Sequence, residues 1–153
     1  MYELDRPATC SIGRAMEILG ERWTFLILRE AFYGVRRFSE MQRNLGIARN
    51  ILSTRLQTLV SAGILERVPY KEEPPRHEYR LTPAGKDLYP AIVTLMRWGD
   101  RHLVGDPPVL LRHACGHEAD PMLVCAHCHE ELHPHDVTPV RADETRHADA
   151  AIR

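Results

Sequence analysis

The sequence predicts a mainly α-helical fold: a winged helix-turn-helix with a small β-hairpin as its wing, followed by a short Cys/His-rich extension. Two short amphipathic helices are separated by the turn Gly46-Ile47-Ala48, which is a helix-turn-helix spacing. Segments rich in β-branched and aromatic residues follow, and three of the four cysteines lie within residues 115–128. The 153 residues suffice for one core and an appendage. We therefore expect a winged helix-turn-helix domain over residues 8–104, the extension over 105–140 and a flexible tail over 141–153.

Capping residues and glycines delimit the first three helices. The first two are expected over residues 9–20 and 21–34, because Thr9 is a good N-cap and a glycine ends each segment. In "FSEMQRNLG", Ser39 precedes Gln42 by three residues, which is the capping-box spacing. The third helix is therefore expected to begin at Ser39 and to end at the following glycine.

The second helix of the motif, "NILSTRLQTLVSAG", has one apolar and one polar side. Leu52, Leu56 and Leu59 recur at helical spacing on the apolar side. The polar side contains no carboxylate at all. Ala48 is a poor N-cap, so Asn50 is an alternative cap that would shorten the helix and remove Asn50 from the polar side.

The segments after this helix predict the wing and a long last helix. "ILERVPY" and "HEYRLT" flank "KEEPPR", which indicates a two-stranded wing over residues 64–82, since paired prolines suit a hairpin loop. Thr82 and Pro83 form a favourable start for one helix of about twenty residues, kinked at Pro90. Its apolar stripe exceeds what so small a core covers, so we expect a second copy of the chain to cover it in a homodimer.

The basic residues are unevenly distributed, although the formal net charge is −1. Between residues 36 and 61 five arginines accompany the single acid Glu40, whereas nine acids and four bases follow residue 103. The first of these stretches is therefore a candidate surface for a polyanion.

Double-stranded DNA would explain the carboxylate-free helix side. A recognition helix in the major groove lies between two rows of phosphates, which repel carboxylates, while amides, hydroxyls and guanidiniums contact base edges. The candidate base-contacting residues are Arg49, Asn50, Ser53, Thr54 and Gln57. The candidate phosphate-contacting residues are Ser39, Arg43 and the wing residues Lys71, Arg76 and His77. The alternative is a winged helix that docks on a protein and does not contact nucleic acid.

Several motifs recur in the order of a known family. They are Cys10, "GERWTFLILRE", "RRFSEM", "LSTRLQTLVSAGILER", "PPRHEYRLTPAG" and "RWG". Residues 10–99 thereby resemble the HxlR family of bacterial winged helix-turn-helix regulators. The resemblance implies a homodimer that binds a pseudo-palindromic operator, usually as a repressor and sometimes as an activator.

Cys10 is a candidate sensor of oxidants or electrophiles. It is expected in the first turn of the first helix, where the helix dipole and Arg14 four residues later favour a thiolate. The resemblance also implies this role, because several family members sense oxidants through a cysteine at this position. The alternative is a small side chain that fills the dimer seam.

The segment "RHACGHEADPMLVCAHCHEELHPHD" is a candidate structural zinc site of ribbon-like form. Cys125 and Cys128 make a CxxC pair, and Cys115 with His117 would complete a tetrahedral set. Competitors for the fourth position are His113, His127 and His129. A solvated histidine-rich loop and a Cys125–Cys128 disulfide are the alternatives.

Other function classes are not favoured. The sequence has no HExxH spacing, no phosphate-cradling glycine loop and no nucleophile elbow, so no enzyme is expected. A catalytic zinc with Glu118 or Glu130 as base is the enzymatic alternative. No apolar run is long enough to span a bilayer and the N-terminus lacks the pattern of a signal peptide, so we expect a cytoplasmic protein without membrane contact.

Overall fold

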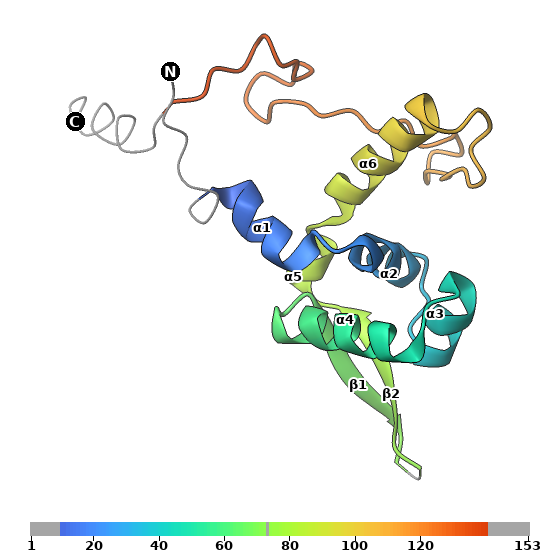
Figure 1. Cartoon of the computed structure of the whole chain (residues 1–153). Coiled ribbons are helices and arrows are strands. Elements are labelled where there is room, and N and C mark those ends of the chain that lie inside the picture. The colour runs from blue at the N-terminus through green and yellow to red at the C-terminus, as the bar shows by residue number, and fades with distance from the viewer. Residues whose placement is uncertain (1–9, 73, 141–153) are drawn as a thin grey trace. The chain divides into compact units, whose positions relative to one another are not determined.

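The computed structural model describes residues 10–72 and 74–140, and the chain divides into two compact units, Met1–Leu103 and Val104–Arg153. Figure 1 shows the first unit, which contains the elements α1 Ser11–Leu19, α2 Arg22–Phe32, α3 Phe38–Leu45, α4 Arg49–Ser61, β1 Leu65–Lys71, β2 Arg76–Leu81, α5 Pro83–Lys86 and α6 Tyr89–His102. This mainly helical fold with a two-stranded antiparallel hairpin is the winged-helix architecture that the sequence predicts. In the part of the chain described, no helix has both the length and the apolar character needed to cross a membrane.

The core of the first unit lies between α2, α3 and α4. The predicted apolar side of α4 is fully buried, because Leu52, Leu56 and Leu59 each have an exposed fraction of 0%. Ile27 of α2 and Met41 of α3 are equally buried in the same cluster. Helical spacing of the leucines thus turns one side of α4 into the core and leaves the other side to solvent.

α1 begins one residue after Cys10. Cys10 is the N-cap, with extended backbone angles (φ −69°, ψ 133°), and its carbonyl accepts the Arg14 N–H at 2.9 Å. The prediction that Cys10 lies inside the first turn is therefore wrong by one position. Thr9, the expected cap, lies outside the described residues.

The predicted capping box of α3 is wrong. The helix begins at Phe38, and Arg37 is its N-cap without a side-chain cap bond, so Ser39 lies in the first turn. The cause is tertiary, because Arg37 forms an antiparallel bridge with Glu78 of β2. The Tyr79 N–H also donates to the Arg36 carbonyl at 2.8 Å, and the chain passes directly from this sheet contact into the helix.

α4 begins at Arg49, so the alternative in which Asn50 caps a shorter helix is wrong. Ala48 is the N-cap and makes no side-chain cap bond. Its carbonyl accepts the Leu52 N–H at 3.0 Å, and Ile47 beside it is only 3% exposed. Burial of Ile47 therefore fixes the turn without help from a capping side chain.

The predicted wing is confirmed. β1 and β2 pair in antiparallel register from Leu65 opposite Leu81 to Lys71 opposite Arg76, with one irregularity between Pro69 and Lys71. Leu65 is 1% exposed, so the hairpin is anchored in the core at its first residue and extends from there into solvent.

The prediction of a single kinked helix after the wing is wrong. α5 ends at Lys86, and α6 begins at Tyr89 with Pro90 in its first turn. Proline has no N–H to donate to the Lys86 carbonyl, so the chain turns and restarts where a helix needs no such donor. The predicted cap is confirmed, since the Thr82 hydroxyl accepts the Gly85 N–H at 3.1 Å.

α6 and α1 carry apolar side chains that the first unit does not cover. Ile92 of α6 is buried against the core, whereas Leu95 is 51% and Trp98 is 53% exposed. On α1, Ile12 is 72% exposed. The excess apolar surface that the sequence predicts is therefore present on the described protomer.

Candidate nucleic-acid interface

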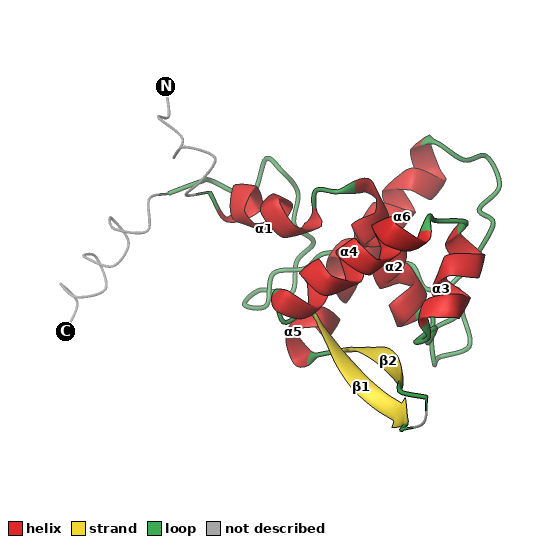
Figure 2. Cartoon of the chain, turned by 60° about the horizontal axis from the view of Figure 1, so that its bottom comes forward, coloured by secondary structure: helices red, strands yellow, loops and turns green. Residues whose placement is uncertain are grey.

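The exposed side of α4 carries every base-contacting candidate. These side chains share exposure to solvent and alternate with the buried leucines: Arg49, Asn50, Ser53, Thr54 and Gln57. α4 packs against α3 and β1 (Figure 2), and no Asp or Glu occurs within its 13 residues. The side that the sequence predicts for DNA is thus accessible and free of negative charge.

Two side chains of α4 have restricted roles. The half-buried Arg55 places its Nε atom 3.9 Å from an Oε2 oxygen of Glu21, the N-cap of α2, so this guanidinium faces the protein. The Thr54 hydroxyl donates to the Asn50 carbonyl at 2.9 Å. Because this hydroxyl hydrogen is already used, Thr54 could contact a base edge only as a hydrogen-bond acceptor or through its methyl group.

Arg49 is held at the junction of the two motif helices. Its guanidinium carbon lies 5.5 Å from the ring centroid of Phe38, the first residue of α3. A cation over an aromatic face is attracted by the ring quadrupole. The ring therefore restrains an exposed arginine that would otherwise sample many rotamers.

α3 presents Ser39 and Arg43 on exposed positions, and its first residue, Phe38, is the one that contacts Arg49 at the start of α4. The acid of this region, Glu40, lies 3.9 Å from the guanidinium of Arg37. A partner of opposite charge reduces the negative potential that Glu40 would present to an approaching polyanion.

A buried carboxylate fixes α3 to α2. Glu30 is only 5% exposed, and its two carboxylate oxygens accept from Asn44 at 2.7 Å and from Arg29 at 2.9 Å. Charge-assisted hydrogen bonds of this kind satisfy a buried carboxylate. Sequence reasoning missed Glu30, although a glutamate within the apolar run "FLILREAF" was the available signal.

The wing end carries a cation on each strand, beside the acids Glu72 and Glu73 of the connecting loop. Lys71 and Arg76 are both exposed and stand directly opposite each other in the register. Like charges directly opposite on paired strands are unfavourable in the protein alone. A phosphate backbone would relieve this repulsion, although the exposed Glu72 beside Lys71 opposes it in part.

His77 is placed differently from the other wing candidates. It is half-buried, and its Nδ1 atom accepts a hydrogen bond from Arg67 Nη2 at 3.0 Å. Arg67 is exposed and is a further cation of the wing. The irregularity between Pro69 and Lys71 interrupts the period-two alternation, so Arg67 shares the strand side of His77 and not that of Lys71. Sequence reasoning missed Arg67, and the available signal was a basic residue within the predicted strand "ILERVPY".

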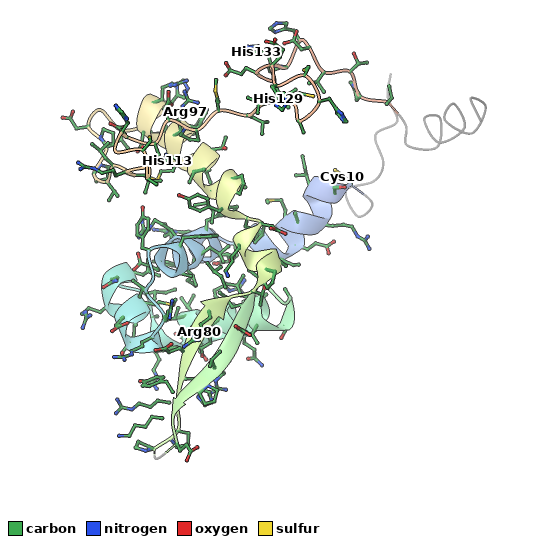
Figure 3. The ribbon with its side chains drawn as sticks, turned by 180° about the vertical axis from the view of Figure 1, so that it is seen from behind. Cys10, Arg80, Arg97, His113, His129 and His133 are labelled. Atoms are coloured by element: carbon green, nitrogen blue, oxygen red, sulfur yellow. The ribbon has the colours of Figure 1, made fainter. Side chains whose placement is uncertain are left out.

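Outside the DNA-facing surface, the four cysteines are free thiols, and Cys10 at the start of α1 is half-buried (Figure 3). Backbone N–H groups of Cys128 and His127 and the Cys128 side chain hydrogen-bond to Cys125, which lowers the pKa of its thiol. Across residues 10–72 and 74–140, no three Cys, His, Asp or Glu side chains already converge as a metal site. The predicted set of Cys115, His117, Cys125 and Cys128 is thus not gathered.

The fold and the exposed helix define the class of helix-turn-helix transcriptional regulators. The sequence profile of the family described as HxlR-like helix-turn-helix matches residues 18–106. The chain therefore belongs to the HxlR family, and the resemblance drawn from its motifs is confirmed. This family consists of transcriptional regulators, which are not a class of enzymes.

Relatives and solved structures agree with this assignment. An uncharacterized HTH-type transcriptional regulator of Mycobacterium tuberculosis is 60% identical over 132 residues, which are 84% of each chain. The crystal structure of the candidate transcription factor PA1607 is 34% identical, with a TM-score of 0.77 over 88% of this chain and 96% of that one. The redox regulator HypR in its oxidized form is 29% identical, with a TM-score of 0.57 over 61% of this chain and 97% of that one.

The extents of these matches differ in one informative way. The Mycobacterium regulator matches 84% of this chain and PA1607 matches 88%, which is more of the 153 residues than positions 1–106 contain. Both proteins therefore include counterparts to part of the extension. HypR is matched almost over its whole length by a much smaller share of this chain. The extension therefore accompanies the winged helix in some relatives only.

Proposed function

We propose that the chain is a dimeric DNA-binding repressor of the cytoplasm that inserts α4 into the major groove of a pseudo-palindromic operator. The observation that carries the proposal is the exposed side of α4, on which no carboxylate stands among five polar or basic side chains. A helix that docks on a protein has no comparable reason to exclude acids. The opposed cations at the wing end favour a polyanionic partner for the same reason.

The groove geometry assigns a part to each element. The major groove is wide enough for one helix, so α4 offers its exposed side to base edges. Ser39 and Arg43 of α3 then face one phosphate row, since the first helix of such a motif crosses the backbone. Lys71 and Arg76 reach the backbone beyond the groove.

Dimerisation through α6 is the second part of the proposal. Leu95 and Trp98 are spaced three residues apart and are about half exposed on the same helix. A two-fold dimer buries such a stripe against its own copy and sets two α4 helices about one DNA turn apart. Palindromic operators match this symmetry.

A thiol response of Cys10 is the third part. Cys10 is half-buried at the N-cap of α1, a helix whose apolar side chains include the exposed Ile12. Oxidation of Cys10 would place a polar group or a cross-link at the end of this helix. The similarity to HypR, a redox regulator, supports a search for such a response.

Removal of one positive charge from α4 tests the recognition helix. Arg49→Ala is expected to weaken binding to the operator by about 1–3 kcal/mol, because a restrained contact to DNA is lost. The operator is first located by footprinting on the DNA upstream of the chain's own gene, and affinities are then measured by fluorescence anisotropy. Lys86→Ala removes the same charge from the exposed surface of α5 and should leave the affinity unchanged. Equal affinities of Arg49→Ala and the unmodified protein would refute the assignment of α4.

A charge on the exposed stripe of α6 tests the dimer. Leu95→Glu is expected to weaken self-association at least about tenfold, because burial of an unpaired carboxylate in an apolar seam is costly. Sedimentation equilibrium measures the monomer–dimer constant. Ala84→Glu adds the same charge at an exposed position of α5, outside this stripe, and serves as the control. A Leu95→Glu protein that dimerises as tightly as the unmodified chain contradicts this seam.

The sensor role is tested by operator binding with and without hydrogen peroxide or diamide. The oxidant is expected to change the affinity of the unmodified protein at least about fivefold, whereas Cys10→Ser should not respond, because it lacks the thiolate that reacts. Ser11→Ala changes the exposed residue next to Cys10, keeps the thiol and should respond like the unmodified protein. A response of Cys10→Ser equal to that of the unmodified chain counts against Cys10.

A further inference from the structure

The extension holds chemistry that DNA binding does not use. Residues 104–140 contain three cysteines and six histidines, yet none of these residues is buried. Large apolar side chains stay exposed as well, among them Val109, Leu110, Met122, Leu123 and Leu132. A segment this short without a core needs a staple, and a bound metal ion is one that its side chains can supply.

Two turns of similar construction contain the three cysteines. One is closed by a bridge between Arg112 and Glu118, and the other by a bridge between Val124 and Glu131. In both turns the residue after a cysteine has a left-handed backbone: Gly116 after Cys115 has φ +90°, and His129 after Cys128 has φ +61°. A positive φ is unusual for a residue other than glycine, so His129 indicates that the turn itself is specified.

The backbone hydrogen bonds make His113 and Cys125 equivalent. Each donates its N–H across its turn at 2.9 Å, His113 to the His117 carbonyl and Cys125 to the Glu130 carbonyl. Each also accepts, through its carbonyl, the N–H of the left-handed residue, at 2.9 Å for His113 and 2.8 Å for Cys125. The first residue of each turn therefore occupies a comparable position, although the second turn contains one more residue between it and the left-handed residue.

The side chains of His113 and Cys125 also accept hydrogen bonds from the backbone of their own turns. The Cys125 sulfur accepts backbone N–H groups from His127 and Cys128. The Nδ1 atom of His113 accepts the backbone N–H of Cys115 at 3.3 Å. In both turns the side chain of the first residue is thus folded toward the inside of its own turn, next to Cys115 or Cys128. A thiolate sulfur keeps lone pairs for a metal beside its hydrogen bonds, whereas His113 has one imidazole lone pair and would exchange the Cys115 N–H for the ion.

From this equivalence we propose that the two turns together bind one zinc-class divalent ion through His113, Cys115, Cys125 and Cys128. Three thiolates and one imidazole form a closed tetrahedral set of the kind that structural zinc takes. The turn geometry favours His113 for the fourth position over His117, which the sequence spacing favours. Figure 3 labels His113 and His129, one in each turn.

The ion must bring the two turns together, since the described residues do not hold three of these ligands in one place. Residues 119–123 connect the turns and supply the chain needed for this movement. Metal binding and ordering of the extension are then one process, as in other small metal-dependent folds. The winged helix belongs to the other unit and contains none of the four proposed ligands.

Zinc analysis of the full-length chain, purified without a histidine tag, tests this site. The unmodified protein is expected to retain about one zinc per chain after dialysis, because four ligands close the coordination sphere. Cys125→Ser and His113→Gln should each weaken zinc binding at least about tenfold in competition with a chromogenic chelator. His117→Gln, in the same turn, should retain zinc like the unmodified protein. Co²⁺ added to the metal-free chain should give the intense visible bands of a tetrahedral thiolate site.

Several results would overturn the proposal. Less than about one tenth of a zinc per chain after reconstitution rules out the site. Loss of zinc in His117→Gln with retention in His113→Gln refutes the ligand set. A mass lower by two hydrogens, located at Cys125 and Cys128 under reducing purification, shows a disulfide instead. Operator affinity and helical circular dichroism, measured on the same variants, report separately on the winged helix.

Discussion

Burial of one side of α4 is the constraint on which the rest of the structure depends. Leu52, Leu56 and Leu59 are fully buried, and each contributes about 1.5–3 kcal/mol relative to exposure. A rotation of α4 about its axis by the angle between successive residues would expose the leucines and bury amide side chains without hydrogen-bond partners. Each of these changes would lower the free energy of unfolding. The hydrophobic effect therefore fixes which side of α4 faces solvent. The absence of acids on that side is what the proposed contact with DNA requires.

Contacts around α4 place the other basic elements relative to it. The buried Glu30 carboxylate of α2 accepts a hydrogen bond from Asn44 of α3, and this bond holds α3 at a fixed position against α2. The bridge between Arg37 and Glu78 joins the start of α3 to β2. α3, α4 and the wing are consequently joined to one another, and all three carry the positive side chains that the proposed contact with DNA uses.

Much of this fold followed from the sequence, and the failures have physical causes. Periodicity and glycines identified α2, α4 and the wing, because these signals are local. The start of α3 was misassigned because a long-range strand contact at Arg37, rather than Ser39, decides where the helix begins. Pro90 was assigned to a kink because a proline within a helical pattern is compatible both with a bent helix and with two separate helices. Spacing favoured His117 for the fourth position of the proposed metal site, whereas the backbone hydrogen bonds, which the sequence does not reveal, favour His113.

The salt dependence of operator binding tests the central claim most directly, because it measures how many phosphates the protein neutralises. For a dimer that contacts about 6–10 phosphates, the logarithm of the association constant should fall linearly with the logarithm of salt concentration, with a slope of about −5 to −9. Anisotropy titrations of the unmodified protein between low and physiological salt provide this slope. A slope near zero would contradict the account, because α4 and the wing would then not lie against a nucleic-acid backbone.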